Sequence, residues 1–271
     1  MANVLTIAGT DPSGAAGIQV DLQVFRDLGH HGLSAITAVL WQNSVGVEGW
    51  RVLSAQELAS QIDVLSRDIA AAAIKIGVLP SAEQVEVVAR FVERAGVPVV
   101  LDPVLASGDG STSLVEPGAT EAMRELLMEH VTVLTPNLPE LALLCGESVD
   151  EQELLAEAAG RGRELLGVAN LLLKAGHLPE SSRPRPAAEI ADAFASASHP
   201  DGKLCQPLPR LAVKNVRGTG CQLSSAIATG LADGLDAYAA CERARKYLWD
   251  LLRRRARFIG KGRAVITRAG E

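Results

Sequence analysis

The stretch VKNVRGTGCQLSSAIATGL, residues 213–231, places a glycine-rich loop directly before an amphipathic segment. Leu223, Ile227 and Leu231 recur every four residues, with small residues beside them. This spacing predicts a helix that packs closely against a flat surface such as a sheet. The glycines and Cys221 then lie at the N-terminus of that helix.

A helix N-terminus is a natural anion site, because its first backbone N–H groups are unpaired and the positive end of the helix dipole lies there. Glycines on both sides of Thr219 let a ligand come close to the backbone. We expect a thiol at this position to ionise more readily than a free cysteine. The alternative is an ordinary loop with a buried cysteine, so the rest of the chain must decide.

The composition is that of a globular chain with a large core: 271 residues, of which 48% are apolar, 21% charged and 3% aromatic. A formal net charge of -6 argues against nucleic-acid binding. The locally basic run at 253–263 is interpreted as a solvated helix face, with a nucleotide-phosphate contact as the alternative. The four cysteines show neither the CxxC spacing of a metal site nor the disulfide framework of a secreted protein. No signal peptide or membrane span is apparent. We therefore expect a cytoplasmic protein without membrane partners.

Short β-rich runs alternate with helical patterns along the chain, which predicts a three-layer α/β/α fold around a mostly parallel sheet. Strands are expected at 4–9, 33–41, 72–77, 98–103, 131–137 and 170–177. Helices are expected from residue 18 to 28 and at 55–69, 81–95, 118–129, 138–166 (more than one helix), 220–232 and 236–258. A hairpin is expected between 189–196 and 202–209 with SHPDG as its turn, after an exposed loop at 178–189. No repeat or linker is apparent, so residues 1–271 are interpreted as one domain.

Ligands of open parallel sheets bind at the carboxyl ends of the strands. In this sequence those ends carry polar or glycine-rich loops, among them GTDPSGAAG, WQNSVG, DPVLASGDG, TPNLPE and KAGH. Each has a simple explanation as a turn. Together they bring Asp102, Glu140 and Lys174 to adjoining strand ends, which favours a site at this rim.

The chain has no GxxxxGK[ST] motif, and GTDPSGAAG does not fit GxGxxG, which disfavours a P-loop ATPase and a dinucleotide enzyme. What remains is a glycine-rich helix N-terminus, acidic residues suited to Mg²⁺ and a lysine at a strand end. These groups indicate phosphoryl transfer, which depends on positioning, charge neutralisation and an acceptor for the hydroxyl proton.

The ordered motifs GTDPSGAAGIQ, ITAVLWQNSVGV, KIGVL, LDPV, TPNLPE, KAGH and RGTGC cover nearly the whole chain. They resemble those of the hydroxymethylpyrimidine/phosphomethylpyrimidine kinases of thiamine synthesis, in the ribokinase-like superfamily. The resemblance implies a homodimer that uses ATP and Mg²⁺. It also implies phosphorylation of 4-amino-5-hydroxymethyl-2-methylpyrimidine and then of its monophosphate.

The resemblance also implies a pyrimidine pocket. Gln42 matches the residue that pairs with the aminopyrimidine edge, as a side-chain amide can because it both donates and accepts; the alternative is a loop amide that caps backbone groups. Asp21 matches part of the substrate wall or is a helix-surface carboxylate. The other matches to this wall are Gly9, Ala16, Val78 and Val104.

At the phosphate end, Asp102 and Glu140 resemble the residues that organise magnesium, directly or through water. Their alternatives are a turn before Pro103 and a charge at a helix N-terminus. The expected nucleotide contacts are Asn137, Lys174, Arg217 and Thr219, although a lysine that ends a strand can also simply reach solvent. The resemblance implies that Gly218, Thr219 and Gly220 form the anion hole and that Cys221 accepts the proton of the substrate hydroxyl.

Several positions depart from the family pattern. Val78 stands where methionine is common, KAGH replaces KGGH, and Val216 and Arg217 replace a threonine and a histidine. The 104–110 loop is altered and 178–189 is inserted, which puts the second phosphorylation most in question. Two alternative functions remain: a pyridoxal or pyridoxine kinase of the same fold, and a non-catalytic paralogue that binds the pyrimidine.

Overall fold

The computed structural model describes residues 1–108, 110, 112–146, 154–176, 189–213 and 215–268. The strands in these ranges are β1 (Asn3–Ala8), β2 (His31–Ile36), β3 (Ala38–Gln42), β4 (Val47–Val52), β5 (Ala73–Ile76), β6 (Val99–Leu101), β7 (Val133–Leu134), β8 (Asn170–Leu173), β9 (Glu189–Ile190), β10 (Ala193–Ser196), β11 (His199–Leu204), β12 (Leu208–Pro209), β13 (Ala256–Arg257) and β14 (Val265–Ile266). The helices are α1 (Gly17–Asp27), α2 (Ala55–Ser66), α3 (Ala82–Ala95), α4 (Ala119–Leu126), the 3-10 helix η1 (Met128–His130), α5 (Leu138–Cys145), α6 (Leu155–Leu166), α7 (Thr219–Ala232) and α8 (Ala237–Arg255).

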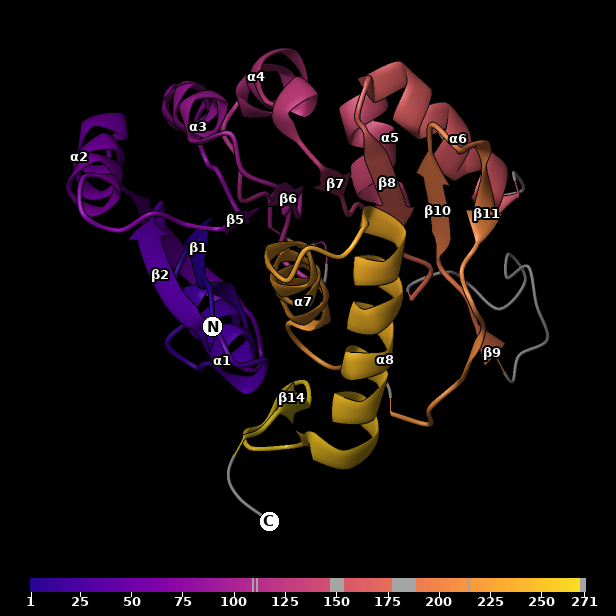
Figure 1. Cartoon of the computed structure of the whole chain (residues 1–271). Coiled ribbons are helices and arrows are strands. Elements are labelled where there is room, and N and C mark those ends of the chain that lie inside the picture. Colours follow the sequence, from indigo (N-terminus) through magenta and orange to yellow (C-terminus); the bar gives the residue numbers. More distant parts are fainter. Residues whose placement is uncertain (109, 111, 147–153, 177–188, 214, 269–271) are drawn as a thin grey trace.

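The central sheet has eight strands in the order β11-β10-β8-β7-β6-β5-β1-β2. Its six strands from β8 to β2 pair in parallel, whereas β10 and β11 form an antiparallel edge next to β8. Helices cover both faces of the sheet, with α1, α7 and α8 on one face and α2 to α6 on the other (Figure 1). The expected three-layer α/β/α class with a mostly parallel sheet is confirmed.

The continuous apolar runs of the strands are explained by this sandwich, because neighbouring residues of a strand face opposite sides. In β6, Val99 and Leu101 join the core beneath α2 to α6, whereas Val100 joins the core beneath α1, α7 and α8. In β8, Leu172 likewise faces away from its two neighbours. A strand buried on both faces therefore needs no alternation of polar and apolar residues.

The single strand expected at 33–41 is wrong, because the chain turns at Thr37 and starts a second strand. The Thr37 backbone N–H donates to Ala8 O at 3.0 Å, its hydroxyl donates to Val78 O at 2.8 Å, and its carbonyl accepts from Leu53 N at 3.0 Å. These bonds end β2, and β3 then leaves the central sheet and forms a two-stranded sheet with β4. The resulting two-stranded ribbon carries Gln42 to the carboxyl edge of the sheet.

The expected hairpin near residues 189–209 forms between β10 and β11, but its turn is misplaced. The turn lies at Ala197 and Ser198, and His199 to Gly202 belong to β11. Gly202 serves packing instead, since it has a φ of 71° and a side chain there would collide with the Ala156 carbonyl oxygen in α6. The exposed loop expected at 178–189 lies outside the described residues apart from Glu189, which belongs to β9.

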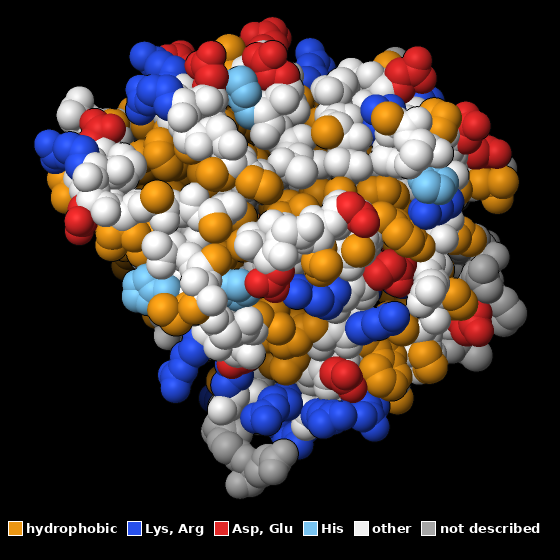
Figure 2. All heavy atoms as spheres, viewed as in Figure 1, with side chains coloured by type: hydrophobic (Ala, Val, Ile, Leu, Met, Phe, Trp, Pro, Cys, Tyr) orange, Lys and Arg blue, Asp and Glu red, His pale blue; other side chains and the backbone are white. Residues whose placement is uncertain are grey.

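The last expected helix ends earlier than residue 258, because α8 stops at Arg255 and the chain then forms the small β13–β14 pair. The interpretation of 253–263 as a helix face thus holds only for 253–255. Figure 2 shows basic side chains gathered at this lower end of the molecule. No helix in the described ranges is long and apolar enough to cross a membrane.

Candidate active site

A pocket opens at the carboxyl ends of the parallel strands, where the sequence places the polar loops. Every site residue expected from the sequence lines it except Asp21. The residues brought together are Gly9, Ala16, Gln42, Val78, Asp102, Val104, Asn137, Glu140, Lys174, Arg217, Gly218, Thr219, Gly220 and Cys221. Segments far apart in the sequence therefore share one site.

The N-terminus of α7 forms one wall of the pocket. Gly218 precedes the helix with a φ of 74°, and a Cβ there would collide with the Ala15 carbonyl oxygen. A Cβ on Gly220 would lie 3.2 Å from Asp102 Oδ2. The glycines thus let the helix start close to α1 and to Asp102, and its first turn, whose backbone N–H groups have no partner within the helix, lines the pocket.

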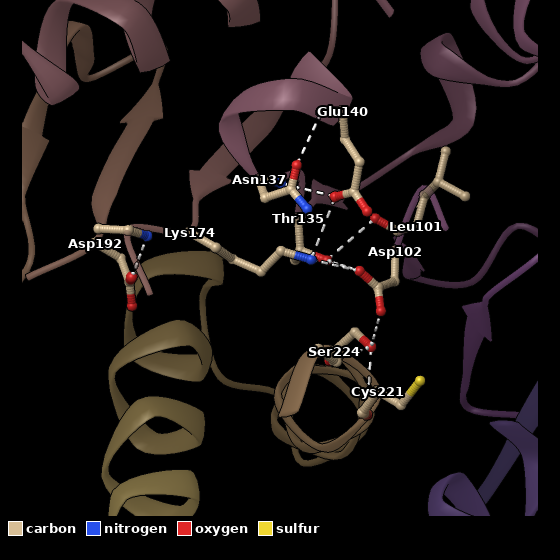
Figure 3. Close-up of polar contacts among 11 residues, drawn as sticks. Leu101, Asp102, Thr135, Asn137, Glu140, Lys174, Asp192, Cys221 and Ser224 are labelled. Carbon is tan, nitrogen blue, oxygen red and sulfur yellow. Dashed lines mark hydrogen bonds and ion pairs between the residues drawn. The ribbon is translucent and has the colours of Figure 1, made fainter. Parts of the chain in front are cut away.

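Lys174, at the end of β8, lies between two carboxylates. Its Nζ is 2.8 Å from Asp102 Oδ1 and 3.6 Å from Glu140 Oε2. Figure 3 shows the lysine and both acids converging beside the first turn of α7. Burial opposes the lysine charge, but Asp102 and Glu140 raise its pKa above the ordinary value. The alternative that this lysine simply reaches solvent is therefore wrong.

Asp102 follows β6 and is 1% exposed. Its Oδ1 accepts from the Thr135 hydroxyl at 3.3 Å, and its Oδ2 accepts from the Ser224 hydroxyl at 3.4 Å. Burial alone would raise the Asp102 pKa, but Lys174 and Lys75 hold it below its usual range. Asp102 is therefore a fixed anion at neutral pH.

Glu140 is positioned by a capping box at the start of α5. Asn137 Oδ1 accepts from Glu140 N at 2.8 Å, and Glu140 Oε2 accepts from Asn137 N at 2.8 Å. The box satisfies two helix-end groups and leaves the carboxylate at the pocket wall. Burial raises the Glu140 pKa, with Asp102 adding to the rise and Lys174 opposing it. The expected helix-end role of Glu140 and its place in the site are thus compatible.

Asp102 and Glu140 offer two carboxylates to a magnesium ion. In the described part of the chain no three His, Cys, Asp or Glu side chains gather closely enough to hold a metal by themselves. Two carboxylates at the edge of a pocket nevertheless fit Mg²⁺, which usually takes one or two carboxylates together with phosphate oxygens and water. The residues present are therefore compatible with a metal that enters with a nucleotide.

Cys221 lies in the first turn of α7, but its thiol does not ionise readily. Burial raises its pKa to about 11; Lys75 opposes the rise, and Asp21 and Asp102 add to it. The local effect of the helix N-terminus is weaker than the desolvation by the surrounding fold. The expectation of an easily ionised thiol is wrong for the ligand-free protein.

Asp21 lies beneath the pocket and not in its wall. It is completely buried, and its carboxylate accepts from the Thr6 hydroxyl at 2.6 Å, the Lys75 ammonium at 2.9 Å and the Ser225 hydroxyl at 2.7 Å. These contacts connect α1 and α7 to β1 and β5. The alternative of a helix-surface carboxylate is also wrong.

Gln42 and Arg217 also line the pocket and contact each other. Gln42 Nε2 donates to Thr10 O at 3.0 Å, and its Oε1 accepts from the Arg217 guanidinium. Arg217, expected among the nucleotide contacts, is also 3.3 Å from Asp11 Oδ2 through its Nε. The structure thus places this arginine in contact with the first loop and with Gln42.

Sequence analysis did not single out Lys75, Asp11, Ser224 or Arg263. Lys75 has a detectable signal, because it is a charged residue inside an apolar strand, two positions before Gly77. Arg263 lines the pocket from the end of the basic run, and its backbone N–H donates to Ser44 O at 2.9 Å. Residues 44 and 263 are far apart in the sequence, so no local pattern predicts their contact.

A parallel α/β sheet whose strand ends gather an open helix N-terminus, a lysine and two carboxylates defines a small-molecule kinase of the ribokinase-like class. A family model described as phosphomethylpyrimidine kinase matches residues 11–266. The chain belongs to this family, as its motifs indicated.

Curated relatives agree with the family model. A hydroxymethylpyrimidine/phosphomethylpyrimidine kinase of Rhizobium meliloti is 37% identical over 97% of this chain and 95% of its own. The Escherichia coli protein of the same description is 39% identical over 83% of this chain and 81% of its own. The similarity therefore extends over nearly the full length of these relatives.

Solved structures share the fold. Phosphomethylpyrimidine kinase from Clostridium difficile is 30% identical, covers 92% of this chain and 99% of its own, and has a TM-score of 0.75. An ADP complex of Bacillus subtilis pyridoxal kinase covers 98% of this chain and 96% of its own, with a TM-score of 0.82 at 23% identity. The similarity to the pyridoxal kinase shows a shared fold alone. That kinase binds ADP in its crystal structure.

Proposed function

We propose that this protein phosphorylates 4-amino-5-hydroxymethyl-2-methylpyrimidine with ATP and then phosphorylates the monophosphate, in thiamine biosynthesis. Family membership and the names of the relatives support this activity. The observation that carries it is that Gln42, the start of α7 and the Lys174–Asp102–Glu140 group line one pocket. A substrate ring held by Gln42 would then direct its hydroxymethyl group toward the proposed phosphate-binding groups.

The proposed reaction forms a bond from the hydroxymethyl oxygen to the γ-phosphorus of ATP and breaks the bond from that phosphorus to the bridging oxygen. ADP leaves with the electron pair, and the hydroxyl proton goes to a base. The backbone N–H groups of Gly218, Thr219 and Gly220 and the Lys174 ammonium would stabilise the charge on the transferring group. Asn137 and Thr219 are the other proposed nucleotide contacts.

Asp102 and Glu140 would hold Mg²⁺, which would neutralise charge on the nucleotide phosphates. Lys174 keeps both acids at the pocket before any ligand binds, with Asp102 as an anion at neutral pH. This arrangement removes the need to order the two carboxylates during the reaction.

Cys221 remains our proposed proton acceptor, although its raised pKa keeps the thiol protonated in the ligand-free protein. Only the thiolate can accept a proton, so ligand binding has to favour ionisation. Lys75 already acts in that direction, whereas the negative charge of Asp102 opposes it. Offsetting the charge of Asp102 when ligands bind would lower the Cys221 pKa.

The test is ATP consumption by the purified protein with Mg²⁺ and the hydroxymethylpyrimidine, beside pyridoxal, with mass spectrometry of the products. We expect pyrimidine monophosphate and then diphosphate, and little of either with Cys221→Ala. Monophosphate alone would remove the second step. Preferred phosphorylation of pyridoxal would replace the proposed substrate, and binding of pyrimidine without any phosphorylation would indicate the non-catalytic paralogue.

We further propose that the chain is one kinase domain that forms a homodimer and works in the cytoplasm, where its ATP is supplied. Exposed apolar side chains on the β3–β4 ribbon, Val39, Trp41 and Val45, support a contact with a second copy. Phe258 is 74% exposed in the segment whose Gly262 packs against Ser44, next to that ribbon. Light scattering should give twice the monomer mass, and Trp41→Ser should reduce it toward the monomer value.

A further inference from the structure

Arg217 occupies a special place in the pocket because it is charged, buried and directly next to Gly218. The side chain is 6% exposed. Its Nε lies 3.3 Å from Asp11 Oδ2, and its terminal nitrogen donates to Gln42 Oε1. The backbone N–H of Arg217 donates to Ala264 O at 2.8 Å, which fixes the start of the side chain as well.

The Asp11 carboxylate has a stable position of its own. Asp11 is completely buried, and its Oδ1 accepts from Ser13 N at 2.9 Å and from the Ser13 hydroxyl at 2.7 Å. Its other oxygen is directed toward Arg217. The guanidinium charge is therefore balanced within the first loop, which disfavours a second use of Arg217 as a phosphate contact.

These neighbours determine which way round the Gln42 amide lies. A guanidinium can only donate hydrogen bonds and a backbone carbonyl can only accept them. Arg217 therefore requires Oε1 on its side, and Thr10 O, 3.0 Å from Nε2, requires the amino group on the other. Oε1 keeps a second lone pair and Nε2 keeps a second hydrogen for a ligand.

We propose that Arg217 is a positioning residue that fixes the donor and acceptor order of Gln42 and so selects rings with an amine next to a ring nitrogen. The inference rests on the proposed function, in which Gln42 reads the pyrimidine. Oε1 accepts from the exocyclic amine, and Nε2 donates to the neighbouring ring nitrogen. A ring without that amine leaves Oε1 with one partner fewer, and the site discriminates against it.

The test compares Arg217→Lys with wild type on two rings: the hydroxymethylpyrimidine and its analogue without the 4-amino group. Lysine keeps the charge next to Asp11 but lacks the planar fork that reaches both partners. Arg253→Lys is the matched control, because that side chain is 49% exposed on α8. Kinetics of both substrates and calorimetric binding of both rings are measured for each protein.

We expect Arg217→Lys to raise the KM for the pyrimidine about 10-fold or more, the scale of one lost hydrogen bond to a charged group. The KM for ATP should stay within about twofold and kcat should change less, because Arg217 acts on the ring end of the site. The preference for the aminated ring should fall by a similar factor. In a Gln42→Ala background the same substitution should have little further effect, since Arg217 acts through Gln42.

Three results would overturn the inference. A raised KM for ATP with an unchanged KM for the pyrimidine would return Arg217 to the nucleotide. Equal losses for both rings would indicate a structural role alone, and additive effects with Gln42→Ala would show that Arg217 acts independently of Gln42. If wild type fails to phosphorylate the pyrimidine, the proposed function fails, and the calorimetric preference between the two rings still decides the role of Arg217.

Discussion

Lys174 Nζ lies 2.8 Å from Asp102 Oδ1 in the ligand-free protein. Lys174 directly follows β8 and Asp102 directly follows β6, with β7 between the two strands in the sheet. The pair lies against Gly220 in the first turn of α7. The lysine is thus held in place before a nucleotide arrives, and the acid stays charged because the lysine is there. Preorganised charge of this kind acts where negative charge develops during phosphoryl transfer.

Lys174→Met should lower kcat by about 10²- to 10³-fold, the scale of one lost preorganised donor. It also removes the main group that lowers the Asp102 pKa, so that acid becomes easier to protonate. Steady-state kinetics with saturating ATP and Mg²⁺ measure the effect. Lys246→Met, at an exposed position of α8, is the control. A kcat within threefold of wild type would remove Lys174 from the phosphate site.

The Cys221 thiol should react as a weak acid in the absence of ligands. With a pKa of about 11, its thiolate fraction rises about tenfold per pH unit from pH 7 to 10. Iodoacetamide labelling of the peptide containing Cys221, followed by mass spectrometry, should show this rise without a plateau. An ordinary cysteine with a pKa near 8.5 levels off above about pH 9. A plateau below pH 8 would show that the helix N-terminus controls the thiol after all.

The two roles of Glu140 can be separated by paired substitutions. Glutamine can still accept from the Asn137 backbone N–H and so keeps the capping box, but it loses the charge. Glu140→Gln should therefore retain the wild-type Tm and need more Mg²⁺ for half-maximal rate. Glu140→Ala should show the same Mg²⁺ defect and also lose about 0.5–1.5 kcal/mol of stability in urea unfolding, the scale of the one hydrogen bond from Asn137 N that it removes. An unchanged Mg²⁺ requirement in both variants would leave Glu140 with the structural role alone.

The fold could be predicted from the sequence wherever it depends on a pattern of neighbouring residues. Continuous apolar runs and helical periods correctly predicted the parallel sheet, and the strand-end rule correctly located the pocket. The turn at Thr37 was missed because its partners are distant in sequence: Ala8 O ends β1, and Val78 O lies in the loop after β5. An apolar run gives no sign of a turn that depends on tertiary hydrogen bonds.

The sequence predicted the site residues at the strand ends but not the buried residues beneath the pocket. Asp102, Glu140 and Lys174 follow strands and so had to meet, whereas Asp21 and Lys75 are 54 residues apart and pair inside the core. The pKa of Cys221 was mispredicted for the same reason. Its position at a helix N-terminus is visible in the sequence, but the burial that raises the pKa comes from the assembled fold.

Gly218→Ala should be poorly tolerated because of a steric collision, and a second glycine with a similar backbone separates this collision from backbone strain. Gly218 and Gly96 both have left-handed backbones, with φ of 74° and 60°. A side chain at Gly96 meets no atom within 4 Å, whereas one at Gly218 collides with the Ala15 carbonyl oxygen. Gly96→Ala should cost about 1 kcal/mol through backbone strain. Gly218→Ala should cost more in urea unfolding and should also lower kcat, since the collision moves the start of α7 away from its place in the pocket. Equal stability losses with full activity in both variants would show that the helix start does not need this close approach.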